Sequence, residues 1–269
     1  MNVNSNLKKI PFFKMMGLSN DFIFIDQKYA FDLRNYIQTI CDRKLGIGCD
    51  QLIMYSEHIE NKSISLYIIN NDGSFAEACG NAFRCAGDYF CSKNSWDQLK
   101  IITSKKEYFI DYKNNTSYVN MGQALVKPIE INDINLKSYM TPFYVNVGNP
   151  HVVLFTNETI NKEDVIELGS LIENHKNFPK KTNVNFVHVI DKQNIKIQTW
   201  ERGIGYSLSC GTGATASFAA SSLLGLVDST ASVKTCGGVI NCSIENKNII
   251  ISGKTLYVFE GVYSLSLLK

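Results

Sequence analysis

Short segments in which apolar and polar residues alternate, or which are rich in β-branched and aromatic residues, follow one another in two series along the chain. Such segments, bounded by Gly, Asn or Asp, are typical of β-strands. The first series predicts strands at residues 22–26, 52–55, 65–70, 99–102 and 108–112. The second predicts strands at residues 144–147, 151–155, 185–190, 196–201, 238–244 and 249–252, and a closing strand within 256–268.

Each series also holds one strongly apolar segment, at residues 82–91 and 214–224, which we predict to be a helix. The second segment is made of Ala, Ser, Thr, Phe and Leu. A helix that is apolar nearly all round is stable only where other elements cover it. We therefore expect each helix to lie at the centre of a surrounding sheet.

The two series match each other at a near-constant spacing, which indicates an internal duplication. The segment Cys79-Gly80-Asn81 opens the first helix, and Cys210-Gly211-Thr212 opens the second, 131 residues later. The other matched pairs, each at a strand end, are Asn20 with Asn149, Gln51 with Asn183, and Asn70 with Glu201. Ordered matches of this kind predict two similar domains related by a pseudo-twofold axis.

The predicted fold class is therefore α/β, of the α+β type, with each domain a mostly antiparallel sheet wrapped around its central apolar helix. We expect an N-terminal domain at residues 1–124 that carries Cys79, and a C-terminal domain at residues 125–258 that carries Cys210. The polar, Asn-rich residues 127–139 are the expected connection. Residues 259–269 are expected to return to the first domain as its closing strand.

The charge balance is nearly even over the 269 residues, with 27 Lys and Arg against 25 Asp and Glu and no long run of either sign. Neither nucleic acid nor a membrane surface is therefore an expected partner. No stretch is apolar enough for a signal peptide or a membrane span, so a cytoplasmic protein is expected.

The eight cysteines form neither an evident disulfide set nor a metal site. A reducing cytoplasm disfavours disulfides, and no C-x-x-C pair occurs. The four histidines fall at no spacing that would place two metal ligands together on a helix. Most cysteines other than Cys79 and Cys210 have apolar neighbours, as small buried side chains do. No metal is expected.

Cys79 and Cys210 are candidate acid and base catalysts. Equivalent loops of two pseudo-symmetric domains meet at the cleft between them, so the two thiols are expected to face each other. Inverting an amino-acid α-carbon requires a base on one face and an acid on the other. The pKa of a cysteine falls from ~8.5 to roughly 3.5–7.5 at helix N-termini or beside cations, so a thiol serves in either role near neutrality.

The backbone N–H groups at the two helix starts are expected to bind the substrate α-carboxylate and to stabilise the charge that builds on it when the α-proton leaves. They would replace the electron sink that pyridoxal phosphate supplies, so no cofactor is expected. An exposed helix dipole contributes only ~0.3–1 kcal/mol, less than the ~1.4 kcal/mol of one pKa unit. His151 and Glu201 are the candidates for further tuning of the thiols.

Each of these residues also has a purely structural interpretation. A helix-start Cys followed by Gly is more often a small buried residue than a base, and His151 alone is typical of a hydrogen-bonded strand residue. Arg202 alone is typical of a surface charge. The duplication favours catalysis, and so does the run WERGIGYSLSCGTGA, which places acid, guanidinium and thiol in one short segment.

The chain resembles the diaminopimelate epimerase family in seven segments that occur in the family's order, namely KMMGLSNDFIFID, GCDQLI, NNDGSFAEACGNAFRC, VNVGNPHVV, TNVNFVHV, WERGIGYSLSCGTGATA and VFEG. The resemblance covers essentially the whole chain. It implies a cytoplasmic, homodimeric isomerase without a cofactor. It also implies that the substrate is the small molecule LL- or meso-2,6-diaminoheptanedioate, in lysine and peptidoglycan biosynthesis.

The resemblance implies roles for individual residues. Cys79 resembles the family's proton donor and Cys210 its proton acceptor for one direction, with exchanged roles in the reverse direction. His151 and Glu201 resemble residues that tune the thiols. The residues that resemble the substrate-binding shell are Asn20, Gln51, Asn70, Gly80, Asn81, Asn149, Asn183, Glu201, Arg202, Gly211 and Thr212. An Arg beside several Asn side chains suits the distal carboxylate of diaminopimelate.

Four places depart from the family's pattern, and none of them removes a catalytic group. Phe75 stands where Glu is usual, and Ala82 where Gly is usual. Tyr206-Ser207 stands where an acidic residue is common. Phe259 occupies a place often held by a Tyr that supports the dimer.

Two other functions are open at this point. A proline or hydroxyproline racemase resembles this fold and uses paired cysteines, although its first motif usually reads CGHG where this chain has CGNA. Its substrate lacks the distal carboxylate that Arg202 would bind. A non-catalytic binding module would hold the cysteines as core residues or as a redox pair, and their replacement would then alter stability and leave any turnover untouched.

Overall fold

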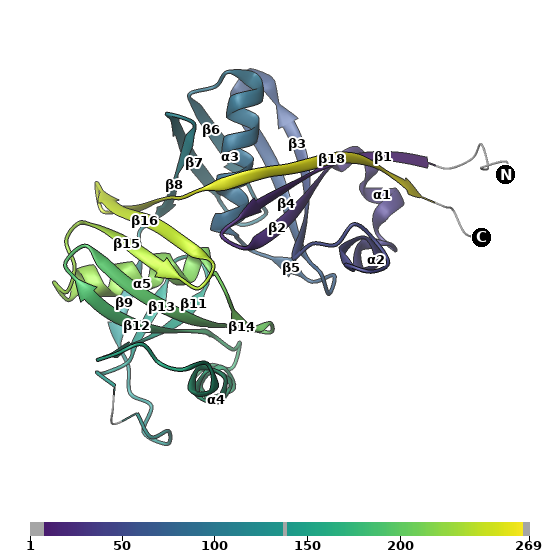
Figure 1. The fold of residues 1–269 in the computed structure, drawn as a ribbon. Helices are drawn as coiled ribbons and strands as arrows, with labels where there is room; N and C mark the ends of the chain where they lie inside the picture. Colours follow the sequence, from purple (N-terminus) through teal and green to yellow (C-terminus); the bar gives the residue numbers. More distant parts are fainter. Residues whose placement is uncertain (1–7, 137–138, 266–269) are drawn as a thin grey trace.

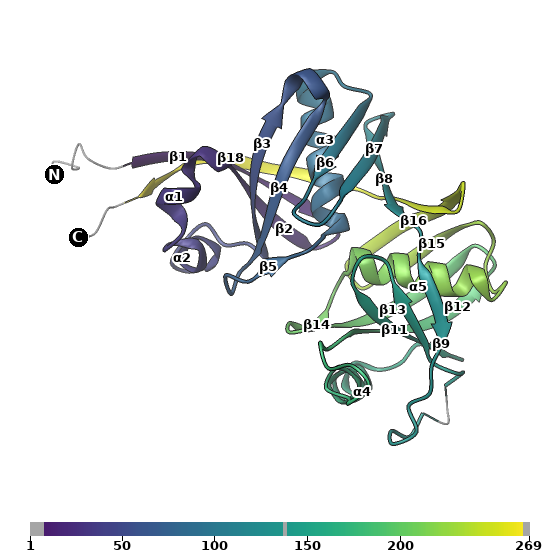
Figure 2. The same ribbon diagram turned by 180° about the vertical axis from the view of Figure 1, so that it is seen from behind.

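The computed structural model of the chain has two similar lobes joined by extended strands (Figures 1 and 2). The structure describes residues 8–136 and 139–265. Within these residues, eighteen strands belong to one hydrogen-bonded sheet system. No helix in the same part of the chain has the length and apolar character needed to cross a bilayer.

The first lobe is a sheet that surrounds the long helix α3 (Gly80–Asn94). Its strands are β1 (Lys8–Gly17), β2 (Asn20–Asp26), β3 (Gln51–His58), β4 (Ser63–Asn70), β5 (Phe75–Ala76), β6 (Gln98–Ile102), β7 (Glu107–Lys113) and β8 (Thr116–Gly122). Two short helices, α1 (Ala30–Leu33) and α2 (Ile37–Cys41), pack on the outer face of β2 and β3.

The second lobe repeats this plan around α5 (Gly211–Leu223), with α4 (Lys162–Glu173) on its outer face (Figure 1). Its strands are β9 (Leu125–Pro128), β10 (Phe143–Asn146), β11 (Pro150–Thr156), β12 (Asn183–Asp191), β13 (Asn194–Glu201), β14 (Gly205–Ser207), β15 (Thr230–Thr235), β16 (Gly238–Glu245) and β17 (Asn248–Ser252). The last strand, β18 (Thr255–Leu265), runs back to the first lobe and pairs antiparallel with β1.

The order of strand pairing is the same in both lobes. In the first lobe β2 pairs parallel with β3, β3 antiparallel with β4, and β4 parallel with β6. In the second lobe β11, β12, β13 and β15 repeat these three pairings. The strands β8 and β17, which end the two series, pair antiparallel with each other. The predicted fold class of two repeated, mostly antiparallel domains is confirmed.

The two central helices form the core with the inner faces of the sheet. Phe83 and Phe90 of α3 and Phe218 of α5 are fully buried, and each such side chain stabilises the fold by roughly 1.5–3 kcal/mol. Every residue of α5 from Gly211 to Ser221 is buried. Two of its buried hydroxyl groups are satisfied within the helix, since Thr215 donates to the carbonyl of Gly211 and Ser221 to that of Ser217.

Several elements were not predicted from the sequence, among them β1, β8, β15 and α4. In α4 the buried apolar side chains are Val165 and Ile172, two turns apart, whereas Ile166 and Leu171 are exposed, so the helix has only a narrow apolar face. The predicted connection is shorter than expected, because Lys127 and Pro128 belong to β9. Residues 1–7, residues 137 and 138 of the connection, and residues 266–269 of the closing strand lie outside the described residues. The domain boundaries at 124/125 and 258/259 stay a proposal.

Candidate active site

A cleft of about 210 Å³ lies where the N-terminal ends of α3 and α5 meet, and residues from both lobes line it. Every residue that the sequence predicted for the site lines this cleft, except His151. These are Asn20, Gln51, Asn70, Cys79, Gly80, Asn81, Asn149, Asn183, Glu201, Arg202, Cys210, Gly211 and Thr212.

The two helix starts are in direct contact at the cleft. Cys79 is the residue immediately before α3, and Cys210 is the residue immediately before α5. A Cβ atom on Gly211 would lie 2.9 Å from Oδ1 of Asn81 and 3.4 Å from Cα of Gly80, so only glycine allows this approach. Two helix N-termini, each with unpaired N–H groups and a positive dipole end, therefore face one cleft.

Cys79 is half-buried and lines the first-lobe side of the cleft. Burial raises the pKa of its thiol to about 11, and the charge of Glu201 acts in the same direction. The backbone N–H of Ala82 and the charge of Arg84 oppose this rise in pKa.

Arg84 is a fully buried cation behind Cys79. Its Nη2 donates to Oδ1 of Asn81 at 3.0 Å, whereas Nε and Nη1 have no hydrogen-bond partner among the described residues. Burial lowers the pKa of Arg84, and the nearby Cys85, Cys79 and Asp88 raise it. A buried charge with so few partners favours an opposite charge close by, so Arg84 favours the thiolate form of Cys79.

Cys210 is buried and sits between hydrogen-bond donors and an acid. Its Sγ accepts from the N–H of Gly213 at 3.3 Å and lies 3.5 Å from the hydroxyl of Thr212. Burial, together with the charge of Glu201, raises the pKa of Cys210 well above its usual range. Burial also raises the pKa of Glu201, and hydrogen bonds with Ser207 and Cys210 lower it. Cys210 is thus held as a thiol, and the carboxylate of Glu201 accepts a hydrogen bond from it.

His151 lies on β11 behind the cleft and is completely buried. Its Nε2 is 3.1 Å from Oδ1 of Asn149, and its Nδ1 is 3.0 Å from Nδ2 of Asn185. Burial, with a smaller effect of Arg202, lowers the pKa of His151 to about 3, so the imidazole is neutral. It reaches the cleft through Asn149, which lines it.

Matched pairs of polar side chains orient the cleft in both lobes. Nδ2 of Asn81 donates to Oδ1 of Asn20 at 2.8 Å, and Nδ2 of Asn149 donates to the hydroxyl of Thr212 at 3.3 Å. In each lobe the residue two places after the cysteine thus bonds the Asn at a strand start. The other amides are also held, since Gln51 donates to Asn70 at 2.9 Å.

The amide of Asn183 holds the loop that carries Arg202. Oδ1 of Asn183 accepts from the backbone N–H of Arg202 at 3.0 Å, and its Nδ2 donates to the carbonyl of Pro150 at 2.8 Å. The guanidinium of Arg202 is partly exposed and donates to the carbonyl of Lys180 at 3.3 Å. Arg202 therefore brings a positive charge to the wall of the cleft.

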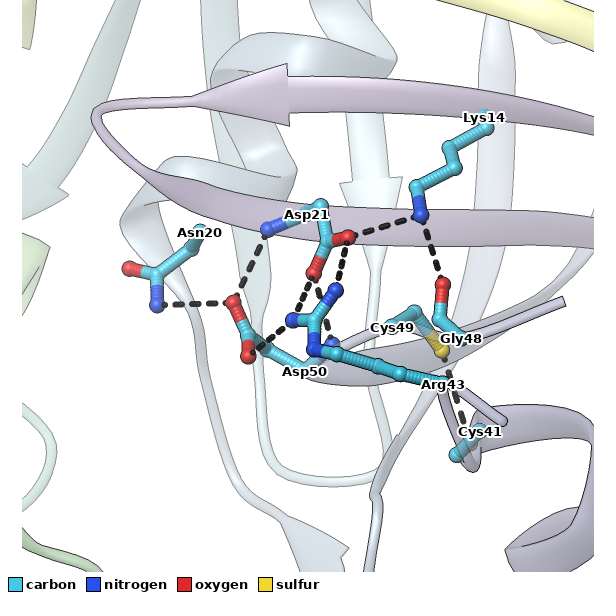
Figure 3. Close-up of polar contacts among 8 residues, drawn as sticks. All are labelled: Lys14, Asn20, Asp21, Cys41, Arg43, Gly48, Cys49 and Asp50. Carbon is cyan, nitrogen blue, oxygen red and sulfur yellow. Dashed lines mark hydrogen bonds and ion pairs between the residues drawn. The ribbon is translucent and has the colours of Figure 1, made fainter. Parts of the chain in front are cut away.

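An ion-pair network supports the first-lobe wall of the cleft (Figure 3). Arg43 donates to both carboxylate oxygens of Asp21 at 2.8 Å and to Oδ1 of Asp50 at 2.9 Å. Lys14 makes an ion pair with Asp21 at 2.7 Å. Burial favours the neutral form of Asp21, yet Arg43 and Lys14 together hold its pKa well below the usual range. Asp50 in turn accepts from Asn20 at 3.4 Å, so the network orients a cleft residue.

Some cleft residues were not predicted, notably Asp50, Glu77, Ser207 and Ser209. The available signal for Asp50 was its place beside Gln51 in the segment GCDQLI. Asn185, which contacts His151 behind the cleft, was also missed. Over the described ranges, no group of three or more His, Cys, Asp or Glu side chains is arranged to hold a metal ion.

Comparison with known proteins gives a consistent family. The family model described as diaminopimelate epimerase matches residues 12–126 and 143–258. The diaminopimelate epimerase of Carboxydothermus hydrogenoformans is 36% identical over 279 residues, which cover 95% of this chain and 100% of that protein. The diaminopimelate epimerase of Prochlorococcus marinus is 34% identical over 281 residues, which cover 94% of this chain and 98% of that protein.

Solved structures of low sequence identity share the fold. A phenazine biosynthesis protein of the PhzF family from Enterococcus faecalis matches with a TM-score of 0.72 and 12% identity, over 96% of this chain and 100% of that one. A hydroxyproline epimerase from Agrobacterium vitis matches with a TM-score of 0.71 and 11% identity, over 99% of this chain and 94% of that one. At such identities the likeness is one of fold alone.

Proposed function

The chain belongs to the diaminopimelate epimerase family, and from that premise we propose that it interconverts LL- and meso-2,6-diaminoheptanedioate by means of Cys79 and Cys210. Membership makes the chain an isomerase. The observation that carries the proposed mechanism is the contact between the starts of α3 and α5, which brings a cysteine from each lobe to one cleft.

The two thiols exchange one proton each with the substrate. One cysteine, as the thiolate, takes the α-proton and becomes a thiol, and the electron pair of the broken C–H bond moves into the α-carboxylate. The other cysteine gives its S–H proton to the opposite face of the α-carbon and becomes the thiolate. Cys79 is the donor and Cys210 the acceptor in one direction, and the roles exchange in the reverse direction. Burial and the Glu201 carboxylate favour the thiol form of both cysteines, and the Arg84 cation behind Cys79 opposes this effect at Cys79.

The helix starts are suited to hold the α-carboxylate. The N–H groups after Cys79 and Cys210 belong to two helix N-termini in contact, and the positive ends of both dipoles act on one small volume. A well-placed donor of this kind stabilises a developing negative charge by ~2.7–4 kcal/mol. Two helix starts therefore serve as the electron sink.

The distal carboxylate and amine of diaminopimelate fit the remaining polar groups. Arg202 offers a guanidinium for the carboxylate, and the amides of Asn70 and Asn183 lie along the same cleft. A substrate without a distal carboxylate leaves Arg202 without a partner, which favours diaminopimelate over proline.

We further propose a homodimer, a cytoplasmic location and a place in lysine and peptidoglycan biosynthesis. All eight cysteines are free, and a mechanism with two thiols requires a reducing compartment. On β18, exposed apolar side chains form a candidate dimer surface, namely Leu256, Val258 and Val262.

The decisive experiment follows solvent deuterium into LL-diaminopimelate with the purified protein. The proposal expects deuterium at the α-carbon together with appearance of the meso form. Cys79→Ser and Cys210→Ser should each slow epimerisation by ~10²–10⁴-fold, as expected for loss of a general acid or base. Exchange into proline or hydroxyproline but not into diaminopimelate would assign the chain to the racemase function. Exchange into neither would favour a non-catalytic module.

A further inference from the structure

The two lobes share a backbone plan but differ in the residues behind the cleft. Phe22 lies beside Gln51 across a parallel strand pair, and His151 lies beside Asn183 in the equivalent pair. Two residues further along the second strand of each pair, Ile53 therefore corresponds to Asn185. All four side chains at these two positions, Phe22, Ile53, His151 and Asn185, are fully buried. The second lobe thus carries a polar pair where the first lobe carries an apolar pair.

This polar pair is not needed by the fold. The first lobe packs Phe22 and Ile53 at the same positions within the same sheet plan. Buried polar groups are unfavourable unless their donors and acceptors are all paired. The pair His151 and Asn185 therefore points to a role at the cleft side of the second lobe, where Cys210 lies.

The hydrogen bonds of Asn185 fix the proton of His151. Nδ2 of Asn185 lies 3.0 Å from Nδ1 of His151 and 3.5 Å from the carbonyl of Val152. Because a carbonyl only accepts, the amide nitrogen must point this way, and its oxygen accepts from the hydroxyl of Thr199 at 3.2 Å. Nδ1 of His151 is then an acceptor, so a neutral imidazole carries its proton on Nε2.

The direction of the next bonds follows from this proton. Nε2–H of His151 donates to Oδ1 of Asn149, and Nδ2 of Asn149 therefore donates to the hydroxyl oxygen of Thr212. The hydroxyl of Thr212, which accepts from Asn149, can then donate its own proton to Sγ of Cys210, 3.5 Å away. A chain of hydrogen bonds thus runs in one direction from Asn185 to the sulfur.

Gly213 makes room for the start of this chain. A Cβ atom on Gly213 would lie 2.5 Å from Oδ1 of Asn185. The corresponding residue of the first lobe, 131 places earlier, is Ala82, and there Ile53 takes the place of Asn185. The second lobe therefore has both Gly213 and the amide of Asn185, whereas the first lobe has neither a glycine nor an amide at these positions.

We propose that Asn185 is a positioning residue for Cys210: it holds the proton of His151 on Nε2 and so directs the chain through Asn149 and Thr212 that ends with a donor on the sulfur. The inference rests on the proposed role of Cys210 as acid and base, and adds the device that orients its proton. A hydroxyl that donates to sulfur favours the thiolate, whereas burial and Glu201 favour the thiol. These hydrogen bonds therefore bring the thiol and the thiolate of Cys210 closer in free energy.

The hydrogen bonds from Asn185 to Cys210 keep the same direction between pH 5 and 9. Burial and the charge of Arg202 lower the pKa of His151 to about 3, so the imidazole takes up no proton between pH 5 and 9. The charged groups that face the chain are Arg202 beside His151 and Glu201 beside Cys210, and Asp50 acts on Glu201 from the first lobe. In this range, titration of Cys210 is read without interference from His151.

The first test reads the proton on His151 by ¹⁵N NMR of histidine-labelled enzyme without substrate. The signal of His151 is assigned by its loss in His151→Phe. The expected signal is that of a neutral ring protonated on Nε2, constant from pH 5 to 9. Asn185→Asp should move the proton to Nδ1, because a carboxylate only accepts. A wild-type ring protonated on Nδ1, or one that titrates near 6.5, overturns the proposal.

The second test reads the thiol. In a Cys79→Ser background, the rate of alkylation of Cys210 by iodoacetamide is followed against pH by mass spectrometry. Asn185→Asp and Thr212→Val should each raise the pKa of Cys210 by about one unit, seen as about tenfold slower alkylation at a fixed pH. Asn241→Asp, the same change at an exposed strand position, is the matched control. An unaltered titration of Cys210 in Asn185→Asp would contradict the proposal.

A third variant guards against loss of folding. His151→Phe combined with Asn185→Ile copies the pair that the first lobe packs, so this protein is expected to fold. It should raise the pKa of Cys210 as Thr212→Val does, and leave that of Cys79 unchanged. Because no substrate is used, a response of Cys210 without exchange into diaminopimelate would refute the proposed function alone. Exchange into diaminopimelate without a response of Cys210 would refute this inference alone.

Discussion

Glu201 is the side chain with an electrostatic effect on both thiols. Its charge raises the pKa of Cys79 and of Cys210, and it also makes a hydrogen bond with Cys210. Burial is the larger cause, and burial and Glu201 together keep both thiols protonated above the usual pKa of a cysteine. A carboxylate in this place suits a residue that keeps an acid protonated until substrate arrives.

Replacement of this carboxylate should make the thiols more reactive and the enzyme slower. In Glu201→Gln the pKa of each cysteine falls, although burial still holds it above the usual range, so at pH 8 a larger fraction is thiolate and alkylation should be several-fold faster. Epimerisation should fall by at least ~10-fold, since general acid–base groups contribute ~10²–10⁴. The exposed Glu245→Gln is the control. Equal alkylation rates in wild type and Glu201→Gln would count against this role.

His151 should make stability depend on acid pH. Its pKa is lowered from 6.5 to about 3, so the unfolded chain takes up a proton at a pH where the folded protein does not. The stability contribution is complete above pH 6.5 and is lost as the pH falls toward 3. Between pH 7 and 4.5, wild type should lose about 2 kcal/mol more than His151→Phe in the free energy of unfolding by urea. If the free energy of unfolding changed with pH equally in wild type and His151→Phe, the pKa of His151 would not be lowered in the folded protein.

At the scale of elements, the sequence was most informative where residues that act together are neighbours in the chain. The motifs around Cys79 and Cys210 revealed both central helices and most of the cleft. The role of Asn185 could not be predicted from the sequence, because its partner His151 lies 34 residues away and meets it only across a strand pair. The strand β1 pairs with the neighbouring β2 as well as with residues 255–265, and it was missed because its sequence KKIPFFKMMG contains a proline and lacks a strict alternation of apolar and polar residues.

Substitutions at Gly213 and Ala82 test whether the residue in the first turn of each central helix is fixed by the space around it. Gly213→Ala should destabilise the protein by ~1–3 kcal/mol, because the new methyl group overlaps Asn185, although alanine favours helices. In the first lobe Ala82→Gly should cost ~1–2 kcal/mol, because it lowers helix propensity and removes a buried methyl group. Thermal unfolding measures both changes. Asn185→Ala added to Gly213→Ala should recover part of the loss, and absence of any recovery would place the strain elsewhere.

At the scale of the whole molecule, the cleft depends on two lobes that hold a sulfur each. We expect oxidation to join Cys79 and Cys210 and to abolish epimerisation, because neither sulfur is then free to move a proton. Peptide mass spectrometry before and after reduction measures the bond alongside activity. Cys41 and Cys49, whose sulfurs lie 3.4 Å apart, must be mapped separately. Full activity with the Cys79–Cys210 bond in place would disprove the two-thiol mechanism.

The proposed dimer places β18 at an interface. Val258 and Val262 are 43% and 55% exposed, and Phe259 packs edge-on against Phe12 with ring centres 5.8 Å apart. Sedimentation equilibrium should give a dimer for the wild type and a monomer for Val258→Asp with Val262→Asp. Val239→Asp, an equally exposed valine on β16, should stay dimeric. A monomeric wild type would exclude the dimer.

The antiparallel pair of β1 and β18 also governs how the protein is made. Lys8 lies beside Leu265, so this edge of β1 stays unpaired until the second lobe and β18 have been synthesised. At roughly 5–20 residues per second, a ribosome needs tens of seconds to extend the chain from Lys8 to Leu265. An unpaired strand edge is a site for aggregation, and prolines and lysines on such an edge discourage wrong pairing. Pro11 and the three lysines of β1 suit a strand that spends its first seconds uncovered beside other nascent chains.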